Sequence, residues 1–207
     1  MRKSISKLIG WLPVVLCLFG GAALLGQKSK PQQKPSGKPI SSDTLGDAVM
    51  EDKLVIVEAY LKKGGNPNAL LHGNTLLTLA SSNGNLDTMR ALLKGGAKVN
   101  LACTDGDTPL LRAARHLYRT GMESLELLIA SGANVNQTFP KGSSPLMMVA
   151  SPASLRYESD YADATKLFLK HGAKVNARNQ MGYTALKIAK NAGALQIVKI
   201  LTAAGAK

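Results

Sequence analysis

Aromatic residues and cysteines are both scarce in this 207-residue chain. Aromatic residues make up 4% of the sequence although 45% of it is hydrophobic, so a folded core must be built mainly from Leu, Val, Ile, Ala and Met. The two cysteines are Cys17, which lies in an apolar N-terminal run, and Cys103. This cysteine content excludes an intrachain disulfide framework and a cysteine-based zinc site.

Acidic residues are missing from the start of the chain. The first is Asp43, and the residues before it hold seven of the 26 basic side chains. The remainder carries 19 basic and 13 acidic side chains, which is a mild positive excess. An excess of this size is typical of a solvated basic surface, so we expect no nucleic-acid partner.

The N-terminal segment 1–26 has the composition of a signal peptide or a membrane anchor. Arg2, Lys3 and Lys7 precede a run of 19 residues, Leu8 to Gly26, without a charged side chain. A basic head followed by an apolar stretch and small residues is typical of a secretory signal. A run of this length can also span a bilayer. Both interpretations stay open, because basic residues flank the run on both sides.

Residues 27–42 form a basic linker that is rich in Lys, Pro, Gln and Ser. Such a composition cannot bury enough apolar surface to fold, so we expect an extended, unpacked segment. Because short basic heads usually stay inside the cell, we expect the rest of the chain to be translocated. The predicted location is secreted or periplasmic, or tethered by the N-terminal segment, which would be the only contact with the membrane.

The rest of the chain repeats itself. A glycine that opens a Gly-Ala-x-Val-Asn element, or a variant of this element, recurs at spacings of 32, 36, 40 and 33 residues. These glycines are Gly64, Gly96, Gly132, Gly172 and Gly205. A second marker, Gly-x-Thr-x-Leu or a close variant, recurs in the same order at Gly73, Gly106, Gly142 and Gly182. Two markers in register predict a stacked array of units of about 33 residues.

Each unit has the signals of two short helices. Thr108 and Pro109 are suited to a helix N-cap and first turn. Apolar residues at helical spacing predict a second helix, and a glycine such as Gly132 ends it. The sequences "GDTPL" and "GAKVN" resemble the ankyrin repeat over Leu45 to Lys207. That resemblance implies an all-α ankyrin-repeat solenoid of about five repeats, occupying residues 43–207, with a degenerate first repeat and a solvated last repeat as caps.

Two features depart from the ankyrin pattern. The family histidine that follows Thr-Pro-Leu is replaced by Thr78, Leu111, Met147 and Lys187. Two units are longer than the others, with added residues around "RHLYRTG" and "SPASLRYESDYAD", which fall between the first and second helices. Because shorter units omit them, we expect that stacking does not require these segments, and that they lie side by side. They are either part of a binding site or neutral insertions at a tolerant junction.

No pattern of catalytic or metal-binding residues stands out. His72, His116 and His171 fall at different places in different units, which argues against a shared metal site. No unit has the spacing of a phosphate-binding loop, and no histidine is placed to activate a serine. We therefore predict neither an enzyme nor a cofactor site.

The resemblance implies that a protein partner meets the turn tips and the first helices on the concave surface, and we expect the chain to be monomeric. Tyr and Arg dominate interface hot spots, and loops on a rigid scaffold often carry function. The candidate partner-binding residues are Arg115, His116, Tyr118, Arg119, Phe139, Arg156, Tyr157, Tyr161 and Tyr183.

Three functions are compatible with such a surface. The first is an exported or membrane-tethered adaptor that binds a protein. The second is an inhibitor or immunity-type protein that blocks a toxic enzyme. The third possibility is a ligand-binding protein or enzyme that uses the surface as a cleft, for which the sequence offers no residues.

N-terminal sequencing tests the export prediction. A cleaved signal should leave a mature chain that begins between about Gly21 and Gln27 and lacks Trp11, because cleavage follows small residues. Intact Met1 in a carbonate-resistant membrane fraction would favour the anchor instead. Full-length soluble protein would contradict both interpretations.

Overall fold

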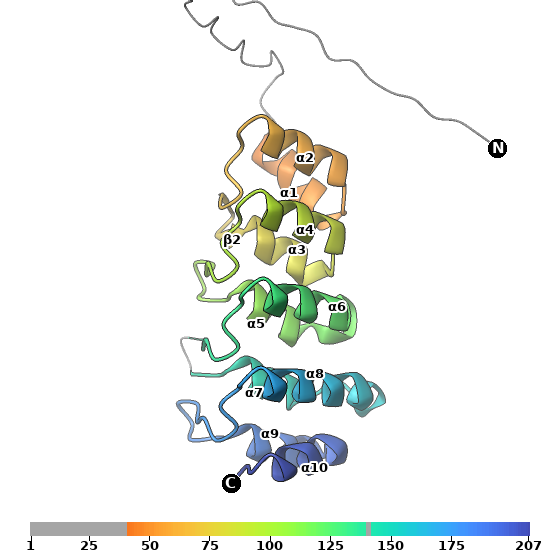
Figure 1. Ribbon diagram of the computed structural model, residues 1–207, viewed down its shortest axis with the longest axis vertical. Helices are drawn as coiled ribbons and strands as arrows, with labels where there is room; N and C mark the ends of the chain where they lie inside the picture. The colour runs from red at the N-terminus through yellow and green to blue at the C-terminus, as the bar shows by residue number, and fades with distance from the viewer. Residues whose placement is uncertain (1–40, 140–141) are drawn as a thin grey trace, which may run out of the picture. The chain divides into compact units, whose positions relative to one another are not determined.

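The computed structural model describes residues 41–139 and 142–207, and the predicted N-terminal segment 1–26 and nearly all of the linker lie outside this part. The described residues form five successive helix pairs, stacked into a solenoid (Figure 1). The pairs are α1 (Ser42–Met50) with α2 (Leu54–Lys62), α3 (Leu76–Asn83) with α4 (Leu86–Lys94), α5 (Pro109–Arg115) with α6 (Leu117–Ala130), α7 (Pro145–Val149) with α8 (Glu158–Lys170), and α9 (Ala185–Ala192) with α10 (Leu195–Ala203). This confirms the predicted all-α ankyrin solenoid. No helix among the described residues is long and apolar enough to cross a membrane.

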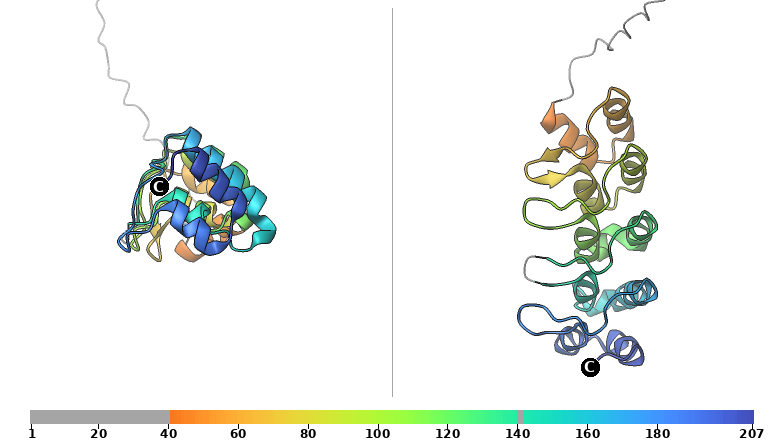
Figure 2. Two further views of the ribbon diagram at one scale, coloured as in Figure 1. Left: turned by 90° about the horizontal axis from the view of Figure 1, so that it is seen from below. Right: turned by 60° about the vertical axis from the view of Figure 1, so that its left-hand side comes forward.

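Extended turns connect the pairs and project from one edge of the stack, as both views in Figure 2 show. One turn includes the strands β1 (Leu70–Leu71) and β2 (Asn74–Thr75), which pair antiparallel. The short 3₁₀ helix η1 (Leu155–Tyr157) precedes α8 in the longest unit. The first helices stack on one another from α1 to α9, and the second helices form a second column beside them, on the side away from the turns (Figure 2).

The same side-chain hydrogen bond opens all five first helices, with Ser41 as the cap of α1. The hydroxyl of Thr108 accepts a hydrogen bond from the backbone N–H of Leu111, and Pro109 occupies the first turn. Thr75, Ser144 and Thr184 cap α3, α7 and α9 in the same way. Such a bond satisfies one of the N–H groups that a helix start leaves free. The predicted helix starts are confirmed.

The repeated glycines follow the second helices in the left-handed conformation. Gly132 has a φ of 88°, and a side chain there would be strained even though a Cβ atom would meet nothing within 4 Å. Gly64, Gly96, Gly172 and Gly205 have similar positive φ values. Glycine is the residue that adopts this conformation at little cost, which explains the repeat marker.

A ladder of asparagine side chains joins each repeat to the next. The Asn100 side chain donates to the Gly132 carbonyl at 3.0 Å and accepts from the Asn134 backbone N–H at 2.8 Å. Asn68, Asn136 and Asn176 make the same pair of bonds to their following repeats. The asparagine that ends each Val-Asn or Pro-Asn element is therefore a clamp between neighbouring repeats.

The core is aliphatic, as the composition predicts, with two aromatic additions. Leu92, Leu125 and Leu128 are fully buried, and so is Phe168 in α8. Each such side chain contributes roughly 1.5–3 kcal/mol by leaving water. At the family histidine positions, Leu111 and Met147 are buried and pack apolar surface where a polar side chain was expected from the family pattern.

The first repeat is more complete than its sequence indicates. The sequence predicts a degenerate first repeat, yet α1 is a regular helix with Ser41 as its N-cap. The Asp52 carboxylate accepts hydrogen bonds from the backbone N–H and hydroxyl of Thr88, and the Asn85 side chain donates to the Val49 carbonyl. These bonds to the second repeat hold the cap although its sequence departs from the repeat pattern.

The asparagine ladder predicts a stability difference between two exposed asparagines. Asn100→Ala should lower the free energy of unfolding by about 1–2 kcal/mol, because it removes two inter-repeat hydrogen bonds. The control Asn191→Ala, at an exposed helical position, should change it by less than about 0.5 kcal/mol. Urea denaturation of both variants measures the difference, and equal midpoints would contradict a clamping role for Asn100.

Candidate functional site

The turn tips and first helices together form one side of the solenoid, which we call the inner surface. Equivalent positions of successive first helices place Leu79 on α3, Arg112 on α5, Met148 on α7 and Ile188 on α9, all partly exposed. At its N-terminal end this surface is hollowed by a pocket of about 420 Å³. Of these four equivalent positions, only the one on α5 carries a charge, Arg112. Arg115 lies about one turn further along the same helix.

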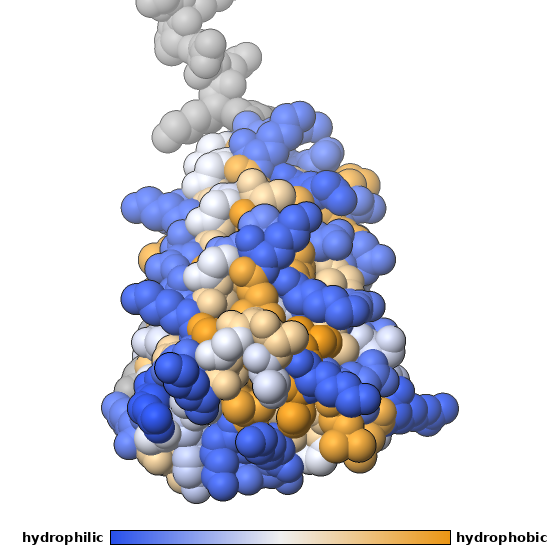
Figure 3. All heavy atoms as spheres, turned by 60° about the horizontal axis from the view of Figure 1, so that its bottom comes forward, coloured by the Kyte–Doolittle hydropathy of each residue, from blue (hydrophilic) through white to orange (hydrophobic). Residues whose placement is uncertain are grey.

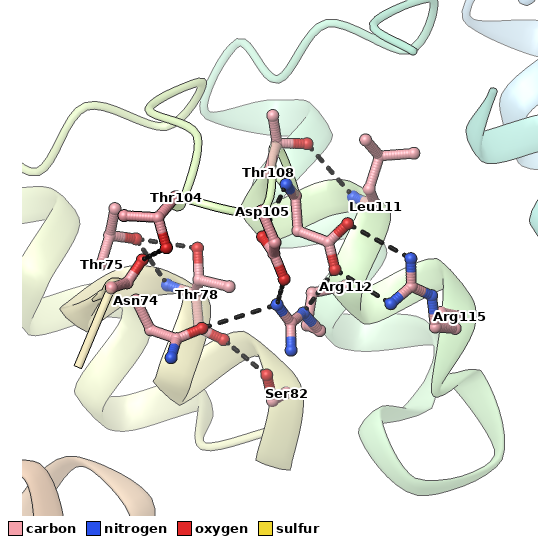
Figure 4. A network of polar contacts seen from close by, with 12 residues as sticks. Asn74, Thr75, Thr78, Ser82, Thr104, Asp105, Thr108, Leu111, Arg112 and Arg115 are labelled. Carbon is pink, nitrogen blue, oxygen red and sulfur yellow. Dashed lines mark hydrogen bonds and ion pairs between the residues drawn. The ribbon is translucent and has the colours of Figure 1, made fainter. Parts of the chain in front are cut away.

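A buried carboxylate organises these arginines. Asp107 has no exposed side-chain surface, and its Oδ2 atom lies 2.8 Å from Nε of Arg112 and 3.0 Å from Nη1 of Arg115. Arg115 also donates from Nη2 to the other oxygen of Asp107 at 3.2 Å. Figure 4 shows both guanidinium groups directed toward the turn that opens the third repeat. Two ion pairs to one buried group fix both guanidinium groups in place.

Arg112 extends this network to the neighbouring repeat. Its Nη2 atom donates to Asp105 at 2.9 Å and to the side chain of Asn74 at 3.5 Å. Asn74 belongs to the preceding turn, so Arg112 links two turns of the inner surface (Figure 4). Only 19% of the Arg112 side chain is exposed, so its role in the structure is mainly to support the turns.

Arg115 stacks on an aromatic ring from the following turn. Its guanidinium carbon lies 4.3 Å from the ring centroid of Phe139, within the range of a cation–π interaction. The Arg115 side chain is 39% exposed, and Phe139 is partly exposed. The structure thus joins two predicted partner-binding residues into one rigid, accessible pair.

Burial and charge shift two ionisable groups here. Burial raises the pKa of Asp107, and the charges of Arg115 and Arg112 oppose that rise. Burial also lowers the pKa of His116, and the charges of Arg119, Arg115 and Arg112 lower it further. His116 ends α5 as its C-cap residue.

The two added segments lie side by side, as predicted. The rings of Tyr118 in α6 and Tyr157 in η1 are 6.2 Å apart, and Tyr118 remains half exposed. Exposed Arg119 and Arg156 accompany them in the sequence. These four residues are called the lateral patch below.

Shorter units stack without added residues, but the first added segment does contact a neighbouring repeat. The Arg119 guanidinium donates to the Ser82 carbonyl of the second repeat. A side chain at Gly84 would meet the Thr120 backbone at 2.8 Å, so the first added segment also packs closely on the end of α3. The segment therefore bridges three repeats, and its deletion would remove stacking contacts together with the exposed side chains.

Tyr161 is not a surface residue, which corrects its prediction as a partner contact. It is 1% exposed because α8 begins earlier than the shorter units would suggest and turns this ring into the core. Burial raises the pKa of its phenol, which is consistent with a structural role. Tyr183, in contrast, is 37% exposed at the last turn tip, in a different repeat from both clusters above.

Asp107 and Arg112 were not among the predicted partner-binding residues. Aspartate is common in tight turns for backbone reasons, and this interpretation of Asp107 does not predict an ion pair with the arginines. A signal was present in the sequence, since Arg112 and Arg115 are three apart and share one face of the helix that follows the aspartate. Recognising the pair required knowing that the turn folds back over the helix.

The described residues contain no group of three or more His, Cys, Asp or Glu side chains that could hold a metal ion. Asp105 and Asp107 both contact arginines, as above, and form no open pair of carboxylates. The arrangement presents charge and aromatic surface for recognition.

The family comparison agrees with this architecture. The model for "Ankyrin repeats (3 copies)" matches residues 45–138 and 118–207. The chain therefore belongs to the ankyrin-repeat family, whose members typically serve as non-enzymatic modules for protein–protein interaction. No curated protein matches the chain.

The buried ion pairs predict a stability cost for removing one charge. Asp107→Asn should lower the free energy of unfolding by about 1–3 kcal/mol, because it leaves two guanidinium groups without their buried partner. The exposed Asp105→Asn should cost less than about 1 kcal/mol. Thermal and urea denaturation measure both, and a larger loss for Asp105→Asn would contradict the central role of Asp107.

Proposed function

We propose that this protein is an exported or membrane-tethered adaptor that binds a protein partner through its inner surface. The observation that carries the proposal is the Arg115–Phe139 pair, held in place by the buried Asp107. The Arg115 and Phe139 side chains are already held in place in the unbound protein, so binding costs little further side-chain entropy.

The chemistry of the pair suits a central contact. Arg and aromatic residues are enriched among the few side chains that carry most of the binding energy at interfaces. Leu79, Met148 and Ile188 on the neighbouring first helices provide partly exposed apolar surface on either side. A partner with an acidic or aromatic side chain at its centre and apolar residues around it fits this pattern.

The export part of the proposal rests on the N-terminal composition. Residues 1–26 combine a basic head with an uncharged run, and the linker that follows would give the repeat domain reach from a membrane. The lateral patch is a second surface that the partner can contact, because Tyr118 is half exposed beside Arg119.

An inhibitor or immunity-type role is the alternative within the same mode of binding. It would use the same inner surface, and the identity of the partner distinguishes the two. A tight one-to-one complex with a toxic enzyme, with loss of that enzyme's activity, would establish inhibition.

Substitution of the central pair tests the proposed surface. The partner is identified by affinity purification of the full-length chain with mass spectrometry, and its affinity is then measured by calorimetry. Phe139→Ala should weaken binding by about tenfold or more, which corresponds to about 1.4 kcal/mol. The control Arg90→Ala, exposed on the second helix α4, should change affinity less than about twofold. Equal affinities for the two variants would exclude the central pair as the contact.

A further inference from the structure

The C-terminal end of the solenoid is strongly and uniformly basic. Asp163 is the last acidic residue, and residues 164–207 contain eight Lys and Arg side chains. The excess of 19 basic over 13 acidic side chains that follows Asp43 is therefore concentrated in this end of the chain. Figure 3 brings this end forward and shows extensive hydrophilic surface on it, next to apolar patches.

Capping of the solenoid explains why this end is polar. Lys187 stands where the preceding repeats have the buried residues Thr78, Leu111 and Met147. Lys190 likewise stands where they have Ser81, Ala114 and Ala150. In the described structure no further repeat packs on this side of α9, and Lys187 and Lys190 are exposed there, as is typical of a capping repeat. Capping does not require that every charge have the same sign.

Local helix energetics do not explain the sign either. Lys187 is the third residue of α9, in the first turn after the Thr184 cap. The N-terminus of a helix carries partial positive charge, so a cation in the first turn is unfavourable and Glu or Gln is preferred there. Lys190, in the last turn, is locally favourable. A residue that opposes its local preference beside like charges indicates a functional constraint.

These lysines line a pocket together with apolar side chains. The pocket has a volume of about 410 Å³, and its cationic lining residues are Arg178, Lys187, Lys190 and Lys207. Met181 and Tyr183 also line it and are 71% and 37% exposed. In the described part of the chain, neither Lys187 nor Lys190 forms an ion pair with a carboxylate. Two charged groups are thus available beside an apolar wall.

We infer that this pocket, the C-terminal basic pocket, binds an acidic segment of a protein partner that also carries an apolar side chain. Carboxylates would pair with Lys187 and Lys190, while the apolar side chain packs on Met181 and Tyr183. A hollow with apolar walls fits a peptide better than the flat surface of a bilayer. The one arginine in it donates to the Gly182 carbonyl at 2.9 Å, which disfavours a role in stacking on nucleic-acid bases. The inference rests on the proposed function, since it specifies the chemistry of the partner.

A charge-neutralising variant with a matched control tests the inference. The full-length chain is titrated with a fluorescein-labelled peptide that alternates glutamate with leucine, and with a peptide that has glutamine in place of glutamate. Lys187→Gln combined with Lys190→Gln should weaken binding of the acidic peptide by about tenfold. The control pair Lys63→Gln and Lys98→Gln removes two exposed cations elsewhere and should change affinity less than about threefold.

Several results would overturn the inference. Equal weakening by the two variant pairs would mean that net charge alone attracts the peptide, and equal binding of the glutamine peptide would remove the role of carboxylates. Displacement of the peptide by phosphatidylserine vesicles or a DNA oligonucleotide at lower charge concentration would assign the pocket to a membrane or to nucleic acid. The folded state is checked by melting, where the pocket variant should melt close to the control because the loss of an unfavourable cation from the first turn of α9 offsets the loss of a favourable one from its last turn.

The same variants separate this inference from the proposed function. If Phe139→Ala weakens the natural partner while the pocket variant affects neither partner nor peptide, the inner-surface function stands and the C-terminal basic pocket is excluded. If only the pocket variant weakens both, the central contact fails and the pocket stands.

Discussion

The repeat-to-repeat hydrogen bonds of four asparagines link the five helix pairs of the described residues into one array. Each of Asn68, Asn100, Asn136 and Asn176 donates to a carbonyl and accepts from an N–H in the next repeat. Both partners are backbone groups that follow a second helix and would otherwise lack an intrahelical bond. A single helix pair cannot bury its own faces, so these bonds act together with the aliphatic contacts between neighbouring repeats.

The inner surface inherits its rigidity from this stacking. Arg115 comes from one repeat and Phe139 from the next turn, so their contact exists only because the turns are held in register. Asp107 supplies the buried charge that orients Arg115, and Arg112 ties the same carboxylate to the preceding turn. The proposed binding surface is assembled from several repeats, so its order depends on the stability of the whole array. At the α9–α10 end of the described array, positions that are buried in the other repeats are exposed and carry Lys187 and Lys190.

Sequence reasoning succeeded where a residue's role is local. Thr108 caps a helix and Gly132 follows one by interactions within a few residues, and both are confirmed. It was wrong for Tyr161, whose burial depends on the path of α8 over the fourth repeat. It did not predict the hydrogen bond of Arg119, which stays exposed while its acceptor lies in the second repeat. In both cases the composition of the added segments suggested an exposed interface, while long-range packing used part of them for stability.

The repeating pattern of glycine, threonine and apolar residues by itself determined the architecture, because turn, cap and helix signals act over short distances and recur in register. The basic excess of the last repeat is likewise readable from the sequence alone. Only the tertiary structure decided which charges are buried, which tyrosines are exposed, and which side chains from different repeats meet. Asp107 is the clearest case, because a turn aspartate becomes a buried ion-pair partner only when two arginines of the following helix lie against it.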